Sequence, residues 1–173
     1  MGMDIEAAAT TGQVRWYPPE SPLVRRKLRR SDMARAIDVA PHVIRDWTAQ
    51  IGSCSEAPVD GWREYSVVDV AMYSLVRVLT RLGMAVDEAA DFAHLIVLGK
   101  SLRILSYRNT PDRVLAHNLD NVTVVAWHDG DEWQICLDHP DQDRPAPAAS
   151  YAVIHPGQVV GDALDRLEGH ANA

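Results

Sequence analysis

Two short helical segments separated by a tight turn dominate residues 31–50. The first helix is expected over residues 32–37, with Ser31 as its N-cap and its apolar side chains on one face. A turn follows at Asp38-Val39. The second helix is expected over residues 41–50, because it opens with a proline, which suits the first position of a helix. Two helices joined by so short a turn are typical of a helix-turn-helix.

The second helix of this pair has one apolar and one polar face. Val43, Ile44 and Trp47 recur at helical spacing and are expected to pack in the core. The opposite face then carries the side chains that could contact a ligand, which are those of His42, Arg45, Asp46 and Gln50.

Basic residues are concentrated around this helix pair. The chain has a net charge of −7, but residues 1–110 carry 14 basic and 13 acidic residues, whereas residues 111–173 carry 3 and 11. Residues 23–47 alone hold seven basic and three acidic residues. A local basic patch is the electrostatic footprint of a nucleic-acid-binding surface, and the acidic half would form a separate module. The alternative is a solvated charge run in a flexible arm.

A turn-and-strand motif and a long helix follow the pair. Residues 51–60 are expected to form a loop, and Gly61-Trp62-Arg63-Glu64-Tyr65 a turn with a short strand. Ser66 is a suitable cap for a helix over residues 67–81, and Gly83 is expected to stop it.

The sequence pattern is less clear at the two ends of the helical region. A fourth helix is expected over about residues 87–98. Residues 99–121 are interpreted as a connector, because Gly99, Asn109, Thr110 and Pro111 break any single long helix there. Residues 1–22, rich in Ala, Thr and Pro, are interpreted as a mobile arm, so the first domain is expected over residues 23–98.

After residue 121 the pattern alternates, as in strands. Strands are expected over residues 122–127, 132–137 and 150–154. Asp129-Gly130 is a strong two-residue hairpin turn, and Pro156 opens a last helix that ends near Gly169. The fold class is therefore α+β. The small module over residues 122–173 is expected to dimerise the chain or to sense a ligand. Its small core needs a partner, either the first domain or a second copy.

Several short motifs occur in one register between residues 28 and 98. They are Asp32-Met33-Ala34, Val39, Ile44-Arg45-Asp46-Trp47, Gly61-Trp62-Arg63-Glu64-Tyr65, Asp69-Val70, Tyr73, Val76, Leu79 and Leu82-Gly83. In this combination the segment resembles the winged helix-turn-helix DNA-binding domain of MerR-type transcription regulators. The Gly61–Tyr65 motif corresponds to the Gly-Tyr-Arg-x-Tyr wing of that family.

The sequence departs from the family pattern at several positions. Asp38 replaces the turn glycine, Ala40 replaces the Ser or Thr cap of the recognition helix, and Asp46 replaces an aromatic residue. The usual long dimerising coiled coil is not visible. Cys54 and Cys136 do not correspond to the cysteines of the metal-sensing branches, so the resemblance implies DNA binding without metal sensing.

The resemblance also implies a set of DNA contacts. The second helix would enter the major groove with His42, Arg45 and Gln50, and the wing would contact the backbone through Arg63 and Tyr65. Arg29 and Arg30, from the basic run that precedes the first helix, could grip neighbouring phosphates or a minor groove. The alternatives are that Arg45 pairs with Asp46 or Asp38, and that Tyr65 belongs to the core.

Other classes of protein lack support in the sequence. There is no glycine-rich phosphate loop, nucleophile elbow or paired-carboxylate motif, so we expect neither an enzyme nor a cofactor. The histidines and two cysteines lack the spacing of a metal site. No apolar run is long enough to span a membrane, and no secretory signal is apparent, which indicates a cytoplasmic protein, nucleoid-associated if it is a bacterial regulator.

The expected function is that of a sequence-specific, MerR-like transcription regulator. It would bind double-stranded DNA as a homodimer on a promoter, where RNA polymerase is a further partner. The first alternative is an excisionase-like or architectural DNA-binding factor that senses no ligand. The second is that the C-terminal module binds a protein and DNA contact is secondary.

Overall fold

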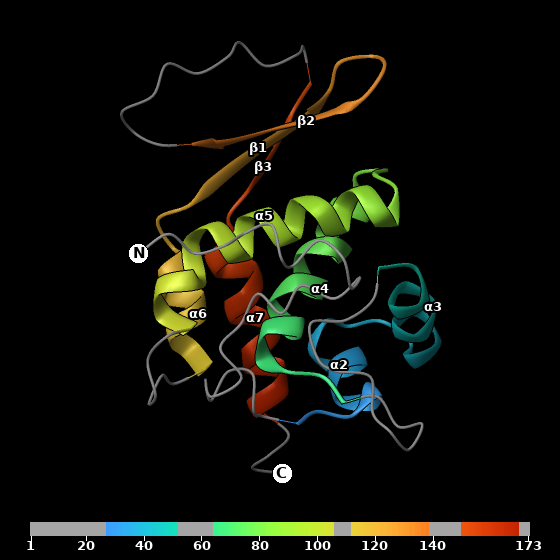
Figure 1. Ribbon diagram of the computed structural model, residues 1–173, viewed down its shortest axis with the longest axis vertical. Coiled ribbons are helices and arrows are strands. Elements are labelled where there is room, and N and C mark those ends of the chain that lie inside the picture. Colours follow the sequence, from blue (N-terminus) through green and yellow to red (C-terminus); the bar gives the residue numbers. More distant parts are fainter. Residues whose placement is uncertain (1–26, 52–63, 106–111, 139–149, 170–173) are drawn as a thin grey trace, which may run out of the picture.

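A computed structural model of the chain describes residues 27–51, 64–105, 112–138 and 150–169 (Figure 1). Within these residues it contains six helices and one three-stranded antiparallel sheet, so the fold class is α+β, as predicted. In chain order the elements are α2 (Arg30–Ala36), α3 (Pro41–Ile51), α4 (Val67–Arg81), α5 (Val86–Leu105), α6 (Asp112–Leu119), β1 (Thr123–His128), β2 (Trp133–Asp138), β3 (Ala152–Ile154) and α7 (Pro156–Glu168).

The helix α4 begins and ends where the sequence predicts. The Ser66 hydroxyl accepts a hydrogen bond from the backbone N–H of Asp69 (3.2 Å), and the Asp69 carboxylate accepts one from the Ser66 N–H (2.7 Å). This capping box satisfies two backbone donors at the start of the helix.

Two details of the neighbouring helices differ from the prediction. The N-cap of α2 is Arg29 rather than Ser31, so the helix begins two residues earlier in the chain than predicted. The carboxylate of Asp32 accepts the Arg29 backbone N–H (3.0 Å), which stabilises this earlier start. Gly99 does not break α5, which continues to Leu105. A glycine inside a helix costs only about 1 kcal/mol relative to alanine, and the packing of α5 against α4, α3 and α6 outweighs that cost.

The last helix packs with the helices at the front of the chain. α7 lies against α6, α4 and α2, and it buries Val160, Ala163, Leu164 and Leu167 (Figure 1). The C-terminal module is expected to pack against either the first domain or a second copy of the chain. In the structure, its helix α7 packs against α2 and α4 of the first domain. The predicted division into domains and the predicted mobile arm remain predictions, since residues 1–26 lie outside the described part.

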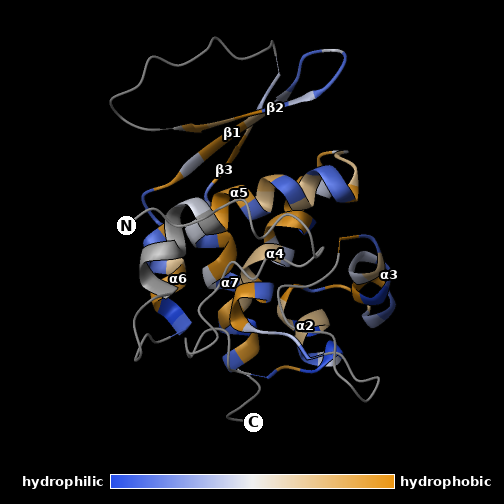
Figure 2. Cartoon of the chain, in the orientation of Figure 1, coloured by the Kyte–Doolittle hydropathy of each residue, from blue (hydrophilic) through white to orange (hydrophobic). Residues whose placement is uncertain are grey.

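The sheet lies on the other side of α5 from α2 (Figure 1). β1 is its central strand and pairs antiparallel with β2 and β3. Val124, Ala126 and Ile154 are buried on its inner face. A hairpin is present at the predicted place, but four residues, 129–132, separate the paired His128 and Trp133, rather than the two predicted. Gly130 has φ 113°, and the Asp129 carboxylate accepts the backbone N–H groups of the two residues that follow Gly130. The hairpin tip is hydrophilic, whereas the strands are largely apolar (Figure 2).

Candidate nucleic-acid interface

The turn between α2 and α3 has the backbone geometry of a helix-turn-helix. Asp38 has φ 54°, in the left-handed region, and the Val39 N–H returns to the Ala34 carbonyl (2.9 Å). This is the position at which the resembling family has glycine. Aspartate occupies it because Asp and Asn tolerate the left-handed region better than most other residues with a side chain.

Two arginines from other helices hold this turn. Arg77 of α4 pairs with the Asp38 carboxylate (2.5 Å), and Arg166 of α7 donates to the carbonyl of Ala36 (2.6 Å). That carbonyl lies at the end of α2, where backbone acceptors lack partners within the helix. Burial and the nearby Arg81 lower the pKa of the Arg77 guanidinium, but an arginine remains charged at neutral pH. These contacts fix the start of α3 relative to the core.

The recognition-helix candidate, α3, is attached to the core by few side chains. Ile44 and Thr48 are its fully buried residues, and Trp47 is partly buried. The side chains of His42, Arg45 and Gln50 are all exposed, as predicted from the helical spacing. The helix therefore presents its polar face outward over its whole length.

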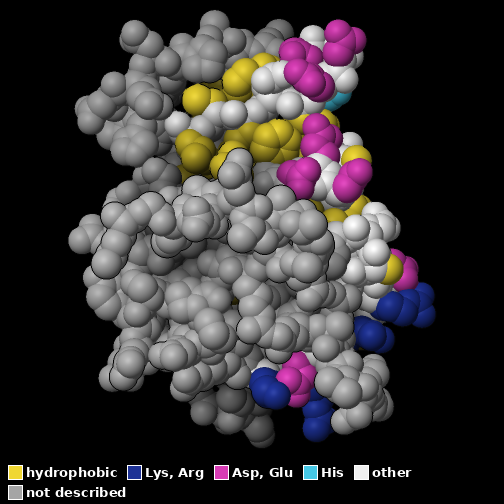
Figure 3. Space-filling model, in the orientation of Figure 1, with side chains coloured by type: hydrophobic (Ala, Val, Ile, Leu, Met, Phe, Trp, Pro, Cys, Tyr) yellow, Lys and Arg dark blue, Asp and Glu magenta, His cyan; other side chains and the backbone are white. Residues whose placement is uncertain are grey.

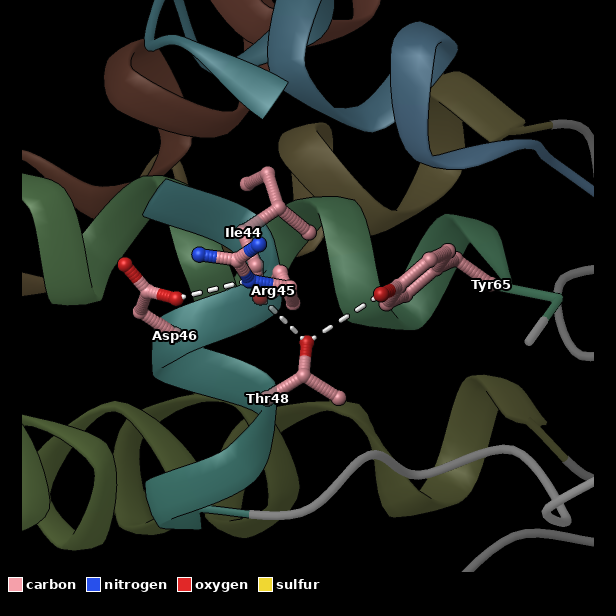
Figure 4. Close-up of polar contacts among 5 residues, drawn as sticks. All are labelled: Ile44, Arg45, Asp46, Thr48 and Tyr65. Carbon is pink, nitrogen blue, oxygen red and sulfur yellow. Dashed lines mark hydrogen bonds and ion pairs between the residues drawn. The ribbon is translucent and has the colours of Figure 1, made fainter. Parts of the chain in front are cut away.

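Arg45 has a partner on the same surface. Its Nε lies 2.9 Å from the Asp46 carboxylate, and the two side chains are 62% and 49% exposed (Figure 4). The structure thus shows the pairing with Asp46 that the sequence left open. An exposed pair between neighbours contributes little to stability. A phosphate or base edge can therefore replace Asp46 as the partner of Arg45 without a large penalty.

A second exposed basic group precedes α2. Arg29 and Arg30 are exposed and have no ion-pair partner among the described residues, whereas Lys27 pairs with Glu64 (2.7 Å). Among the described residues on the face shown in Figure 3, Lys and Arg side chains lie near α2 and α3, and Asp and Glu side chains lie mainly at the hairpin and at the start of α5.

Tyr65 does not lie on this surface. Its side chain is 1% exposed, and its hydroxyl is 3.1 Å from the hydroxyl of Thr48 (Figure 4). Its ring packs edge-on against that of Tyr73, with ring centroids 6.2 Å apart. A phosphate contact requires an accessible hydroxyl, so we leave Tyr65 out of the contact surface and assign it to the core, the alternative considered above.

The predicted wing lies mostly outside the described residues, and Arg63 is among the residues not described. The part of the wing that is described ends in an antiparallel bridge between Leu28 and Tyr65, with N–O distances of 2.8 and 2.9 Å. This bridge joins the segment before α2 to the segment before α4.

Sequence reasoning missed three positioning residues. Thr48 lies one helical turn after Ile44, so the spacing that placed Ile44 in the core also indicated Thr48. Arg77 and Arg166 gave no such signal, because their partners lie far away in the sequence.

Within the described residues, no group of three or more His, Cys, Asp or Glu side chains could hold a metal ion. None of the helices in that part of the chain combines the length and apolarity needed to cross a bilayer.

Comparison with known proteins agrees with this geometry. Residues 28–94 match the model of the MerR HTH family regulatory protein. The match begins at the Leu28 bridge and includes α2, α3, α4 and the first part of α5. A search of curated proteins found no match. Residues 28–94 are therefore a MerR-type helix-turn-helix domain, which indicates a DNA-binding transcription regulator.

Proposed function

We propose that this protein binds specific promoter sequences as a homodimer and regulates transcription there. The observation that carries the proposal is the match over residues 28–94, in a segment whose α3 buries Ile44 and exposes His42, Arg45 and Gln50. A helix held in this way can place its outer side chains in a major groove.

The proposed contacts fall into two kinds. His42, Arg45 and Gln50 on α3 would reach base edges or phosphates in the major groove. Arg29, Arg30 and Arg63 would contact phosphates, which add affinity and orientation rather than sequence preference. The acidic hairpin would be kept away from the DNA by repulsion between like charges.

The proposed homodimer would match a target with two-fold symmetry. A two-fold protein reads two half-sites of a near-palindrome, and distortion of the duplex between them would let RNA polymerase use the promoter. Such a regulator would act in the cytoplasm, where it meets the bacterial nucleoid.

The test is crosslinking of the tagged protein to genomic DNA, followed by sequencing. Sharp peaks upstream of genes that share a two-fold motif are expected, and they should disappear in an Arg45→Ala variant. Arg113→Ala is the matched control, because Arg113 is also exposed but pairs with Asp165 and Glu168 at the contact between α6 and α7. A folded wild-type protein without enrichment at any site would contradict the proposal.

An excisionase-like or architectural factor is the second candidate. It is favoured by the packing of α5 against α3, α4 and α6, which makes α5 part of the core rather than a projecting dimerisation helix. Protection of head-to-tail direct repeats in a footprint would support this candidate, whereas one protected palindrome would support the regulator.

A further inference from the structure

The hydroxyl of Thr48 joins three elements of the DNA-binding domain. It lies 2.6 Å from the carbonyl of Ile44, 3.1 Å from the Tyr65 hydroxyl and 2.9 Å from the Tyr73 hydroxyl (Figure 4 shows the first two contacts). Thr48 is 5% exposed, and both tyrosines are 1% exposed. The contacts therefore connect α3, α4 and the segment that precedes α4 in a place without direct access to water.

The hydrogen-bonding capacity of the three groups fixes the direction of each bond. A threonine hydroxyl has one donor and two acceptor sites. The carbonyl of Ile44 can only accept, so Thr48 donates to it, and both tyrosine hydroxyls donate to Thr48. All three sites of the Thr48 hydroxyl are then used. The Tyr65 proton is consequently engaged within the core.

This network adds directional restraints to the apolar packing of α3, in which Ile44 is buried and Trp47 and Ile51 are partly buried against the core. Ile44 and Thr48 are the fully buried residues of the helix. Apolar burial is non-directional, whereas hydrogen bonds require narrow ranges of distance and angle. The Thr48 network therefore restrains the rotation of α3 about its own axis, and this rotation determines where His42, Arg45 and Gln50 point.

We propose that Thr48 is a positioning residue that sets the sequence preference of the DNA interface through the rotation of α3. The inference rests on the function proposed above and adds a determinant of specificity that makes no DNA contact. Loss of the network should weaken binding to the preferred sequence. It should leave binding to unrelated DNA unchanged, because the basic residues that contact phosphates are still present.

The experiment uses the full chain and a duplex that the wild-type protein selects from a random-sequence library. In the triple variant Thr48→Val, Tyr65→Phe, Tyr73→Phe, all three hydroxyls of the network are absent, so none of them is left as a donor or acceptor without its partner in the network. Its stability should therefore stay close to that of the wild type. Affinity for the selected duplex should fall roughly 5- to 150-fold, the equivalent of one good base contact. Affinity for a scrambled duplex should be unchanged.

Thr48→Ser is the matched control, because serine keeps the hydroxyl and should retain the wild-type sequence preference. A folded triple variant with the wild-type ratio of selected to scrambled affinity would overturn the positioning role and leave the proposed function intact. A wild-type protein that selects no sequence would overturn the proposed function and, with it, the inference.

Discussion

Arg166 donates a hydrogen bond of 2.6 Å to the carbonyl of Ala36, across 130 residues of sequence. The bond ties the last turns of α7 to the end of α2, immediately before the turn that leads into α3. The C-terminal helix is thereby a direct support of the helix-turn-helix. The domain matched by the MerR family model consequently depends on a residue outside residues 28–94.

Arg166→Ala is expected to destabilise the whole chain. The substitution leaves the Ala36 carbonyl without its charged donor, and the free energy of unfolding should fall by about 1–2 kcal/mol. Urea unfolding followed by circular dichroism measures the change. Arg113→Ala, which removes a solvent-exposed ion-pairing arginine at the contact between α6 and α7, should have a smaller effect. Equal losses for the two variants would argue against a special role for Arg166.

The elements that could be predicted from the sequence are those with local signals. Ser66 and Asp69 lie three residues apart and form the cap of α4 by themselves. Asp129 and Gly130 likewise form their turn by local means, since the Asp129 carboxylate accepts a nearby backbone N–H and Gly130 adopts a positive φ. The polar face of α3 followed from helical spacing alone, and His42, Arg45 and Gln50 are exposed as expected.

The remaining features depend on contacts between distant segments. Gly99 is unfavourable in a helix, but the packing of α5 against its neighbours decided the outcome. The burial of Tyr65 depends on Thr48 and Tyr73, which its own motif does not reveal. The Arg166 bond could not be inferred, because nothing near Arg166 in the sequence identifies a carbonyl in α2 as its acceptor.

Gly157 and Gly161 of α7 should respond in opposite directions to alanine. A Cβ at Gly157 would lie 2.6 Å from the backbone N and Cα of Asp120, which cannot move without shifting the turn after α6. Gly157→Ala should therefore cost about 1–3 kcal/mol of stability. A Cβ at Gly161 would make ordinary contact with Ala116 at 3.9 Å, so Gly161→Ala should gain about 0.5–1 kcal/mol from helix propensity. Thermal unfolding of both variants checks the contrast, and a stable Gly157→Ala protein would contradict the close approach.

Asp38 contributes to stability through its left-handed backbone and through its side-chain pair with Arg77, and two variants separate these contributions. Asp38→Gly restores the family's turn residue and removes only the partner of Arg77, which leaves a largely buried guanidinium unpaired. Asp38→Ala also places a methyl group at φ 54°, where a left-handed residue costs about 1–2 kcal/mol. Both variants should be less stable than the wild type, with alanine the worse by about 1 kcal/mol in urea unfolding. Equal stabilities would mean that the turn relaxes after substitution.

His94 of α5 should make stability depend on pH. Burial lowers the pKa of His94 below its ordinary value of 6.5, and the nearby Asp91 only partly opposes this effect. The unfolded chain therefore binds a proton more readily than the folded one, so stability falls as the pH drops below about 6.5 toward the folded-state pKa. The free energy of unfolding of a His94→Gln variant should decline less between pH 7 and pH 5 than that of the wild type. Parallel pH profiles would rule out this contribution.

Arg63→Ala tests the phosphate contact proposed for the wing. A lysine or arginine that neutralises one phosphate releases about one counterion, so its loss should reduce the slope of log affinity against log salt by about one. Affinity should fall to a similar extent for preferred and unrelated duplexes, because a phosphate contact carries no sequence information. Fluorescence anisotropy at several salt concentrations measures both quantities. Arg113→Ala carries the same change of charge at a site away from α3 and should retain the wild-type slope. An unchanged slope in Arg63→Ala would remove Arg63 from the interface.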